Sequence, residues 1–206
     1  MRTVKNMNDM LQNITWKISS WDYDKVNHIA NSLEIPPLIA HLLINRGIDT
    51  VSKAEEFFKP SVSQIVSPFL LKGMDSAVER IIEAKNRNEK VWIFGDYDVD
   101  GIAGTALLTR GLKRFGIQQV FPHLPERLSN GYGLTPDIVD RAYADSVSLI
   151  ITVDNGISTI PAGLRAMELG IDLIITDHHI PSKDLPKAKS IINPRLEEPD
   201  HPSANL

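Results

Sequence analysis

From residue 76 onward, short apolar segments alternate with stretches that have the apolar spacing of a helix. We expect strands at residues 91–95, 118–122, 148–153, 171–176 and 190–192, and helices at residues 102–115, 136–144 and 159–169. Leu149-Ile150-Ile151 and Leu173-Ile174-Ile175 are wholly apolar, which is typical of strands buried on both faces. The alternation therefore predicts an α/β fold in which a parallel sheet is sandwiched by helices.

The N-terminal part of the chain has a different pattern. Residues 1–72 show no strand alternation, and apolar spacing predicts short helices at residues 24–33 and 37–45. Residues 60–72 have the composition of an irregular linker. We therefore expect a small helical N-terminal region over residues 1–72 and a single α/β domain over residues 73–206.

Two segments match the sequence signature of a capping box at a helix start. Ser52 is followed by Glu55, and Ser76 is followed by Glu79. In a capping box the serine hydroxyl and the acidic side chain bond reciprocally to the first backbone N–H groups of a helix. Both serines are therefore predicted to begin helices.

Composition limits the possible chemistry. The chain has no cysteine, which excludes disulfides, thiolate metal sites and thiol nucleophiles, so metal ligands must be Asp, Glu or His. No signal segment is present, and no run approaches the ~18 apolar residues that a membrane helix needs. We expect a soluble cytoplasmic protein with no membrane contact.

The net charge of −4 argues against a broadly basic surface but leaves room for a local basic groove. The oligomeric state does not follow from the sequence.

Acidic and imidazole side chains follow three of the predicted strands. Asp96, Asp98 and Asp100 come directly after the first strand, Asp154-Asn155-Gly156 after the third, and Asp177-His178-His179 after the fourth. The carboxyl ends of parallel strands share one edge of the sheet, and ligands bind in the crevice there. Groups that are distant in sequence are therefore expected to converge on one site.

Each segment taken alone has a simpler explanation. Alternating aspartates are often a solvated loop, Asp-Asn-Gly is often a tight turn, and a His-His pair is often inert surface. An EF-hand loop is excluded, because position 12 counted from Asp96 is Leu107 instead of glutamate. The shared placement of all three segments at strand ends favours a functional site.

The residue types favour divalent metal ions. Neighbouring carboxylates raise one another's pKa unless a cation compensates them, and carboxylate oxygens suit Mg²⁺ and Mn²⁺. Asp98, Asp100, Asp154 and His178 would supply ligands for one ion and most of a second, and His179 would be a neighbouring ligand or a general acid. Two such ions catalyse hydrolysis of phosphate esters.

At these residues the sequence resembles the DHH phosphoesterase superfamily. Its successive motifs are similar to Asp96-Tyr97-Asp98-Val99-Asp100-Gly101, Val153-Asp154-Asn155-Gly156 and Asp177-His178-His179. Three further features narrow the resemblance to the RecJ family of single-strand-specific exonucleases: Leu124-Pro125-Glu126-Arg127 with Asn130-Gly131-Tyr132-Gly133-Leu134, the helical N-terminal region, and Asn193-Pro194. The resemblance covers nearly the whole chain.

The resemblance implies an activity and a role for each site residue. The implied reaction is 5′-to-3′ hydrolysis of single-stranded DNA to mononucleotides with Mn²⁺ or Mg²⁺, in repair and recombination. The family's metal positions match Asp98, Asp100, Asp154 and His178, while Asp96 and Asp177 match carboxylates that either bind an ion directly or support its ligands. With His179 these residues form the expected catalytic set.

Two residues outside the acidic loops are candidates for substrate binding. Arg127 is a candidate phosphate clamp, because a guanidinium binds phosphate oxygens bidentately. Tyr132 is suited either to stacking on a base of single-stranded DNA or to packing within the protein.

The chain departs from the RecJ family in its extent, because it ends at Leu206. Members of that family continue into the rest of the catalytic domain, with a further metal-binding aspartate, and then into a closing domain and an oligonucleotide-binding fold. We therefore expect a truncated catalytic domain with weak or no activity alone. Two alternatives stay open: a DHH phosphoesterase of short oligonucleotides, cyclic dinucleotides or pyrophosphate, and a non-catalytic Mg²⁺-binding α/β module.

Overall fold

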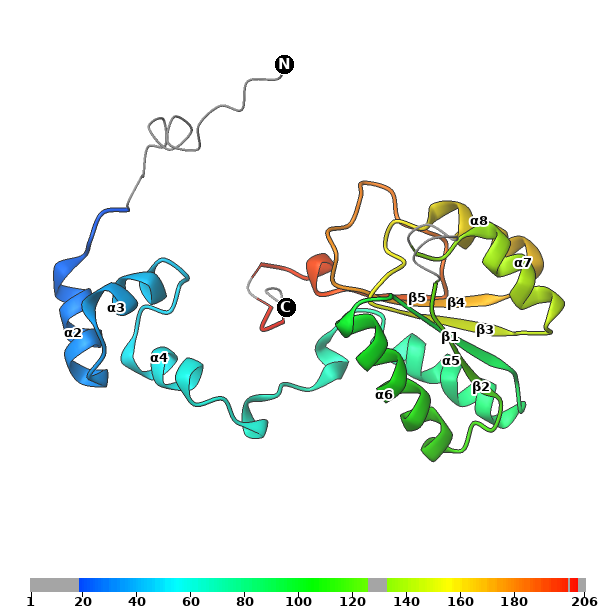
Figure 1. The fold of residues 1–206 in the computed structure, drawn as a ribbon, viewed down its shortest axis with the longest axis horizontal. Coiled ribbons are helices and arrows are strands. Elements are labelled where there is room, and N and C mark those ends of the chain that lie inside the picture. The colour runs from blue at the N-terminus through cyan, green and yellow to red at the C-terminus, as the bar shows by residue number, and fades with distance from the viewer. Residues whose placement is uncertain (1–18, 126–132, 200, 204–206) are drawn as a thin grey trace, which may run out of the picture. The chain divides into compact units, whose positions relative to one another are not determined.

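The computed structural model describes residues 19–125, 133–199 and 201–203. The chain divides into two compact units, one ending at Ile65 and the other beginning at Val66 (Figure 1). The division expected from sequence, between residues 72 and 73, stays a prediction. Among the described residues, no helix is both long and apolar enough to cross a membrane.

The first unit is helical, as the sequence predicted. It contains α2 (Tyr23–Leu33), α3 (Pro37–Ile44) and α4 (Val51–Phe58), followed by a short 3₁₀ turn, η1 (Val62–Gln64). The three α-helices share a small apolar core, formed by Val26, Ile29, Ala30, Ala40, Leu43 and Ala54. This unit carries none of the acidic loops.

The second unit is built on a five-stranded sheet. Its strands are β1 (Val91–Gly95), β2 (Val120–His123), β3 (Leu149–Val153), β4 (Asp172–Thr176) and β5 (Ser190–Ile192). They lie in the order β2-β1-β3-β4-β5, and every neighbouring pair is parallel. The predicted parallel sheet is therefore confirmed.

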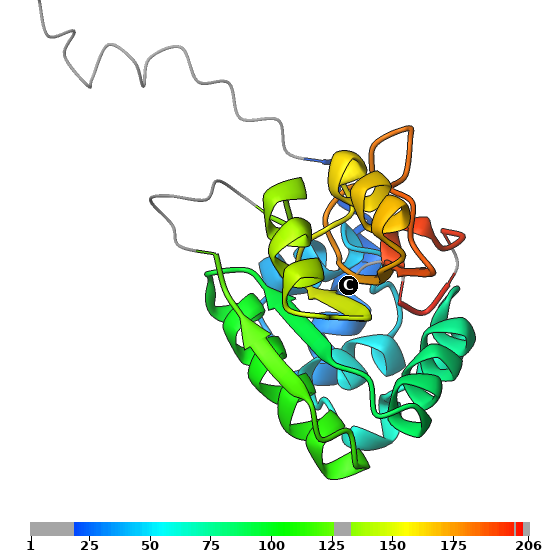
Figure 2. The ribbon, with the colours of Figure 1, turned by 90° about the vertical axis from the view of Figure 1, so that its right-hand side faces the viewer.

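Helices cover both faces of this sheet, α5 (Met74–Asn86) and α6 (Val99–Phe115) on one face and α7 (Pro136–Ala144) and α8 (Ile160–Leu169) on the other (Figures 1 and 2). Alternate residues of β1 point to opposite faces. Trp92 and Phe94 join the core beneath α7 and α8, while Val91 and Ile93 join the core beneath α5 and α6. Burial on both faces explains why the strands are almost wholly apolar.

The structure corrects both capping-box predictions. Ser52 lies inside α4, whose N-cap is Thr50, and the Thr50 hydroxyl accepts the N–H of Lys53 at 3.3 Å. The N-cap of α5 is Gly73, so Ser76 lies inside the helix and its hydroxyl donates to the Gly73 carbonyl at 3.0 Å. The spacing of serine and glutamate recurs within helices, so the motif alone does not fix where a helix begins.

Tertiary packing explains the start of α5. Gly73 has φ of +81°, in the left-handed region, and a Cβ there would lie 2.6 Å from the backbone oxygen of Ile191 in β5. Only glycine fits that close approach without distortion. Helix α5 therefore begins directly after Gly73, the residue whose lack of a side chain allows the backbone to lie against β5.

Candidate metal centre

One row of polar residues lies along the carboxyl edge of the sheet. Gly95 pairs with Val153, Val153 with Thr176, and Thr176 with Ile192. The next residue of each strand continues the row, and these residues are Asp96, Asp154, Asp177 and Asn193. Each is at most 9% exposed. Parallel register thus brings the three predicted loops to one edge, and it adds Asn193 from β5.

The loop after β1 leads directly into α6. The Asp96 carboxylate accepts the N–H of Tyr97 at 2.6 Å. Asp98 is the N-cap of α6, and its Oδ1 accepts the N–H groups of Asp100 and Gly101, both at 3.0 Å. The helix therefore begins at Val99, within the acidic segment and three residues before the predicted start. The cap fixes the position of the Asp98 carboxylate.

The turn after β3 places Asp154 in an unusual backbone conformation. Asp154 has φ of 62°, in the left-handed region that few non-glycine residues adopt. The buried amide of Asn155 secures the turn by donating to the carbonyls of Phe94 at 3.1 Å and Val153 at 2.9 Å. The Asp-Asn-Gly segment is thus a tight turn that also holds a carboxylate at the edge of the sheet.

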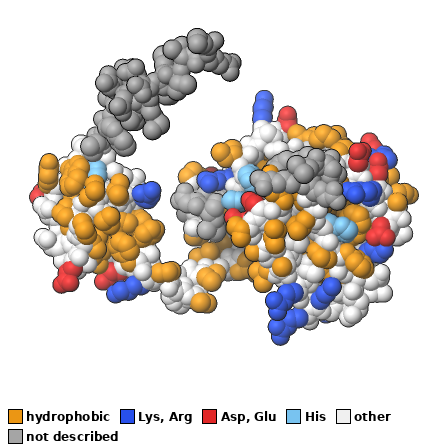
Figure 3. Space-filling view, in the orientation of Figure 1, with side chains coloured by type: hydrophobic (Ala, Val, Ile, Leu, Met, Phe, Trp, Pro, Cys, Tyr) orange, Lys and Arg blue, Asp and Glu red, His pale blue; other side chains and the backbone are white. Residues whose placement is uncertain are grey.

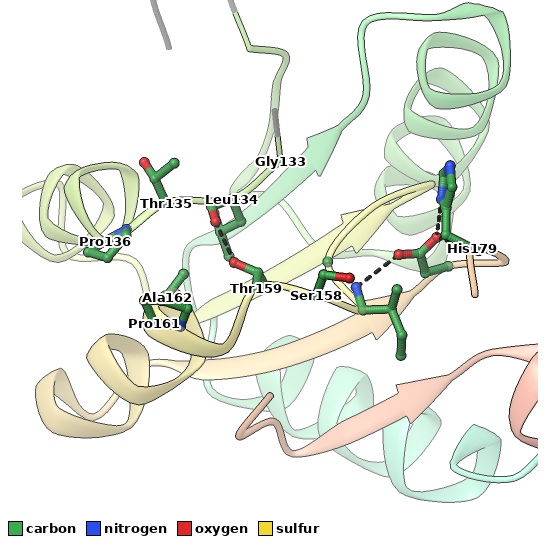
Figure 4. A pocket seen from close by; sticks show the side chains of 12 residues that line it. Gly133, Leu134, Thr135, Pro136, Ser158, Thr159, Pro161, Ala162 and His179 are labelled. Atoms are coloured by element: carbon green, nitrogen blue, oxygen red, sulfur yellow. Dashed lines mark hydrogen bonds and ion pairs between the residues drawn. The ribbon is translucent and has the colours of Figure 1, made fainter. Parts of the chain in front are cut away.

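Asp177 organises the loop after β4. Its Oδ1 accepts the N–H groups of His178 at 2.7 Å and His179 at 3.1 Å, and it lies 2.7 Å from Nδ1 of His179. Its Oδ2 accepts the N–H of Ile157 at 2.9 Å, which links the loop to the turn after β3 (Figure 4). Both oxygens are engaged within the protein, so Asp177 is suited to supporting ligands more than to being one.

Among the residues that the structure describes, two groups of side chains are close enough to hold a metal ion. Asp96, Asp98 and Asp154 form one group, and Asp154, His178 and His179 form the other. Within each group one ligand atom from each residue lies within 4.8 Å of the others. Asp154 belongs to both groups. In the space-filling view, acidic and histidine side chains lie next to one another on the surface of the α/β unit (Figure 3).

The electrostatics of Asp154 fit a bound cation. Its Oδ1 is buried and accepts no hydrogen bond from the described residues, and its neighbour is His178 Nε2 at 2.9 Å, an ion pair when the imidazole is protonated. Burial, together with the charge of Asp98, raises the pKa of Asp154. A divalent ion would compensate both effects, so the residues present fit a metal with oxygen and nitrogen ligands.

Hydrogen bonds shift the pKa of two other groups of the site, Asp98 and His179. The N–H of Gly101 is the main cause that lowers the pKa of Asp98, so this carboxylate stays ionised. The bond to Asp177 raises the pKa of His179. The same bond orients the imidazole, as partners of metal-binding histidines commonly do.

Asp100 lies near other predicted ligands but belongs to neither ligand group of the described residues. Asp100 lies in the first turn of α6 and lines a shallow hollow with Asp154, Thr176, Asp177 and His178. It is in neither ligand group found among the described residues, so its role as a ligand stays a prediction. The predicted substrate-binding residues Arg127 and Tyr132 lie outside the described residues.

Sequence reasoning gave no structural role to Asn155 or Asn193. Both are 1% exposed, and both donate side-chain hydrogen bonds to backbone carbonyls at the site. Their position was a usable signal, because each lies within two residues after a predicted strand.

Fold and site together define a class of α/β domains that hold divalent ions at the carboxyl edge of a parallel sheet. Residues 90–204 match the family described as the DHH family, N-terminal domain. Because the match covers more than half of the chain, this protein belongs to the DHH family.

Individual proteins similar to this chain are RecJ exonucleases, the family that the sequence motifs resemble. The chain is 38% identical over 191 residues to the single-stranded-DNA-specific exonuclease RecJ of Bacillus subtilis (strain 168), covering 93% of this chain and 24% of that protein. A crystal structure of exonuclease RecJ bound to manganese matches with a TM-score of 0.60 and 38% identity, over 66% of this chain and 34% of that chain. RecJ from Thermus thermophilus in complex with Mn²⁺ matches with a TM-score of 0.65 and 29% identity, over 89% of this chain and 25% of that chain. The chain thus spans about a quarter of the length of the B. subtilis protein.

Proposed function

We propose that this chain is the metal-binding part of a 5′-to-3′ exonuclease that hydrolyses single-stranded DNA with two Mn²⁺ or Mg²⁺ ions, in cytoplasmic DNA repair and recombination. The observation that carries the proposal is the convergence of two ligand groups on Asp154. The similarity to RecJ proteins supports the choice of substrate.

The proposed roles follow from the geometry. Asp96, Asp98, Asp154, His178 and His179 would hold the ions, which supply positive charge to the scissile phosphate and lower the pKa of an attacking water. The α6 N-cap bonds keep the Asp98 carboxylate at the edge of the sheet. With a metal ion bound, Asp177 would accept the Nδ1 proton of a neutral His179, which would leave the Nε2 lone pair for the ion.

A pocket beside His179 is suited to the sugar and base of the terminal nucleotide. Its volume is about 330 Å³, within the usual range for ligand sites. Leu134, Pro136, Ile157, Pro161 and Ala162 give it an apolar lining, and Ser158 adds a hydroxyl (Figure 4). Asp177 lines both this pocket and the hollow at the metal centre, so a nucleotide in the pocket would reach the ligand groups.

The test is a product assay with 5′-labelled single-stranded DNA and Mn²⁺. A protein extended past Leu206 to the length of its relatives should release 5′-mononucleotides, and a variant with Asp98→Ala and Asp154→Ala should not. The 206-residue chain should show weak or no release. Cleavage of dinucleotides, cyclic dinucleotides or pyrophosphate in place of long strands would contradict the proposed substrate.

A further inference from the structure

The loop that carries both histidines is open to solvent beyond the site. Asp177 fixes its amino side by accepting the N–H groups of His178 and His179. On its carboxyl side, Ile180 is 82% exposed, and the described residues 180–189 form no helix or strand. A contact on this carboxyl side would therefore restrict the backbone of His179 further.

We propose that Asn193 supplies this restraint and is a positioning residue of the metal centre. Its Nδ2 donates to the His179 carbonyl at 3.0 Å, so the backbone of His179 is held at both its N–H and its C=O. This inference rests on the proposed metal binding and concerns how the imidazoles are presented to Asp154.

Asn193 is itself firmly placed. It is 1% exposed, it directly follows β5 in the polar row, and its Oδ1 accepts the N–H of Arg195 at 2.8 Å. Both ends of its side chain are thus engaged, and this fixes the direction in which the amide N–H points. The short turn that follows, η3 (Pro194–Leu196), begins from this bond.

The segment before α5 anchors this region independently of the histidine loop. Lys72 donates its backbone N–H to Glu197 Oε1 at 2.7 Å and its Nζ to the Leu196 carbonyl at 3.1 Å. Ser190, on β5, donates its hydroxyl to the Gly73 carbonyl at 2.5 Å. The chain on both sides of Asn193 is therefore held by contacts that do not involve the proposed metal ligands, which lets Asn193 act as a fixed support.

The experiment compares Asn193→Ala with Ser190→Ala. Both variants remove a hydrogen bond from a buried residue's side chain to a backbone carbonyl, but of the two residues only Asn193 bonds to the histidine loop. Direct Mn²⁺ titration, with free Mn²⁺ read by electron paramagnetic resonance, should show a 10- to 100-fold loss of affinity for Asn193→Ala, the effect typical of losing a residue that supports metal ligands. Ser190→Ala should lower thermal stability yet keep the Mn²⁺ dissociation constant within about twofold of wild type, well below that range.

A titration of the wild-type chain covers the case in which Asn193→Ala does not fold. In ¹⁵N NMR spectra, the side-chain amide of Asn193 and the backbone amide of His179 should shift along the same Mg²⁺ binding curve. An unchanged Asn193 signal at saturation, or unchanged Mn²⁺ affinity in a folded Asn193→Ala protein, would overturn the positioning role while leaving the proposed function intact. Wild-type protein that binds neither ion would overturn both.

Discussion

Asp154 is the residue of the site whose ionised form is disfavoured by burial and by a neighbouring carboxylate. It is buried, lies near Asp98, and has a backbone conformation that few residues other than glycine adopt. A raised pKa means that ionised Asp154 destabilises the metal-free fold, and this cost builds up as pH rises from the unfolded-state pKa to the higher folded-state pKa. The sequence predicted that Asp154 belongs to the site, but it could not predict this cost, which depends on burial and on the turn.

Asp154→Asn should therefore stabilise the metal-free chain at neutral pH. The substitution removes the buried charge, and asparagine also tolerates the left-handed conformation. Thermal unfolding should show a higher melting temperature than wild type at neutral pH. The difference should shrink as pH falls through the raised pKa, because wild-type Asp154 then becomes neutral too.

Asp145→Asn provides a control of opposite sign. A hydrogen bond from Lys90 lowers the pKa of Asp145, so its charge contributes stability that is present at neutral pH and lost as pH falls. This variant should melt below wild type at neutral pH. A lower melting temperature for metal-free Asp154→Asn at neutral pH would contradict the account of the buried carboxylate.

At the scale of elements, one residue at the start of α6 both stabilises the helix and is a candidate metal ligand. Asp98 caps the helix and belongs to a ligand group. Asp98→Asn keeps an acceptor oxygen for the N–H groups of Asp100 and Gly101, whereas Asp98→Ala removes it. The asparagine variant should keep most of its metal-free thermal stability, and the alanine variant should lose some.

Both Asp98 variants should bind Mn²⁺ more weakly than wild type, because both remove the charged ligand. Calorimetric unfolding and Mn²⁺ titration separate the two effects. Equal loss of metal-free stability in the two variants would show that the capping bond does not hold α6 in place.

Gly101 is the glycine on which the acidic loop depends. A Cβ at Gly101 would lie 2.5–2.6 Å from backbone atoms of Asp96, and the start of α6 would have to shift. Gly101→Ala should therefore lower both thermal stability and Mn²⁺ affinity.

Gly111 gives a matched control in the same helix. A Cβ there would meet nothing within 4 Å. Gly111→Ala should stabilise the fold by about 0.5–1 kcal/mol, because alanine is favoured over glycine in a helix interior. Unchanged stability and Mn²⁺ affinity in Gly101→Ala would show that the loop tolerates a shifted helix start.

Elements were predictable from sequence where a local pattern determines them. The alternation of apolar strands and helices gave the order of elements and the two-sided packing. The starts of α4, α5 and α6 were not predicted correctly, because Thr50, Gly73 and Asp98 act through hydrogen bonds or close approaches that the apolar pattern does not reveal.

At the scale of the whole molecule, the register of the parallel sheet brings together side chains from separate sequence motifs. It aligns Asp96, Asp154, Asp177 and Asn193 at one edge, although they are spread over about a hundred residues. Sequence reasoning predicted this convergence for the aspartates because strand ends were recognisable. It did not predict the ion pairs of buried Arg80 with Glu89 and Asp172, since these depend on side-chain packing between distant segments.

The central claim is that carboxylate and imidazole groups from separate loops hold divalent ions together, and Mn²⁺-dependent stabilisation tests it most directly. Thermal unfolding should be measured with and without Mn²⁺ for the wild-type chain and for a variant with Asp98→Ala and Asp154→Ala. At 100 times the dissociation constant, one bound ion should stabilise the wild type by about 2.7 kcal/mol and leave the variant unchanged. A wild-type unfolding curve that Mn²⁺ does not move would contradict the metal centre.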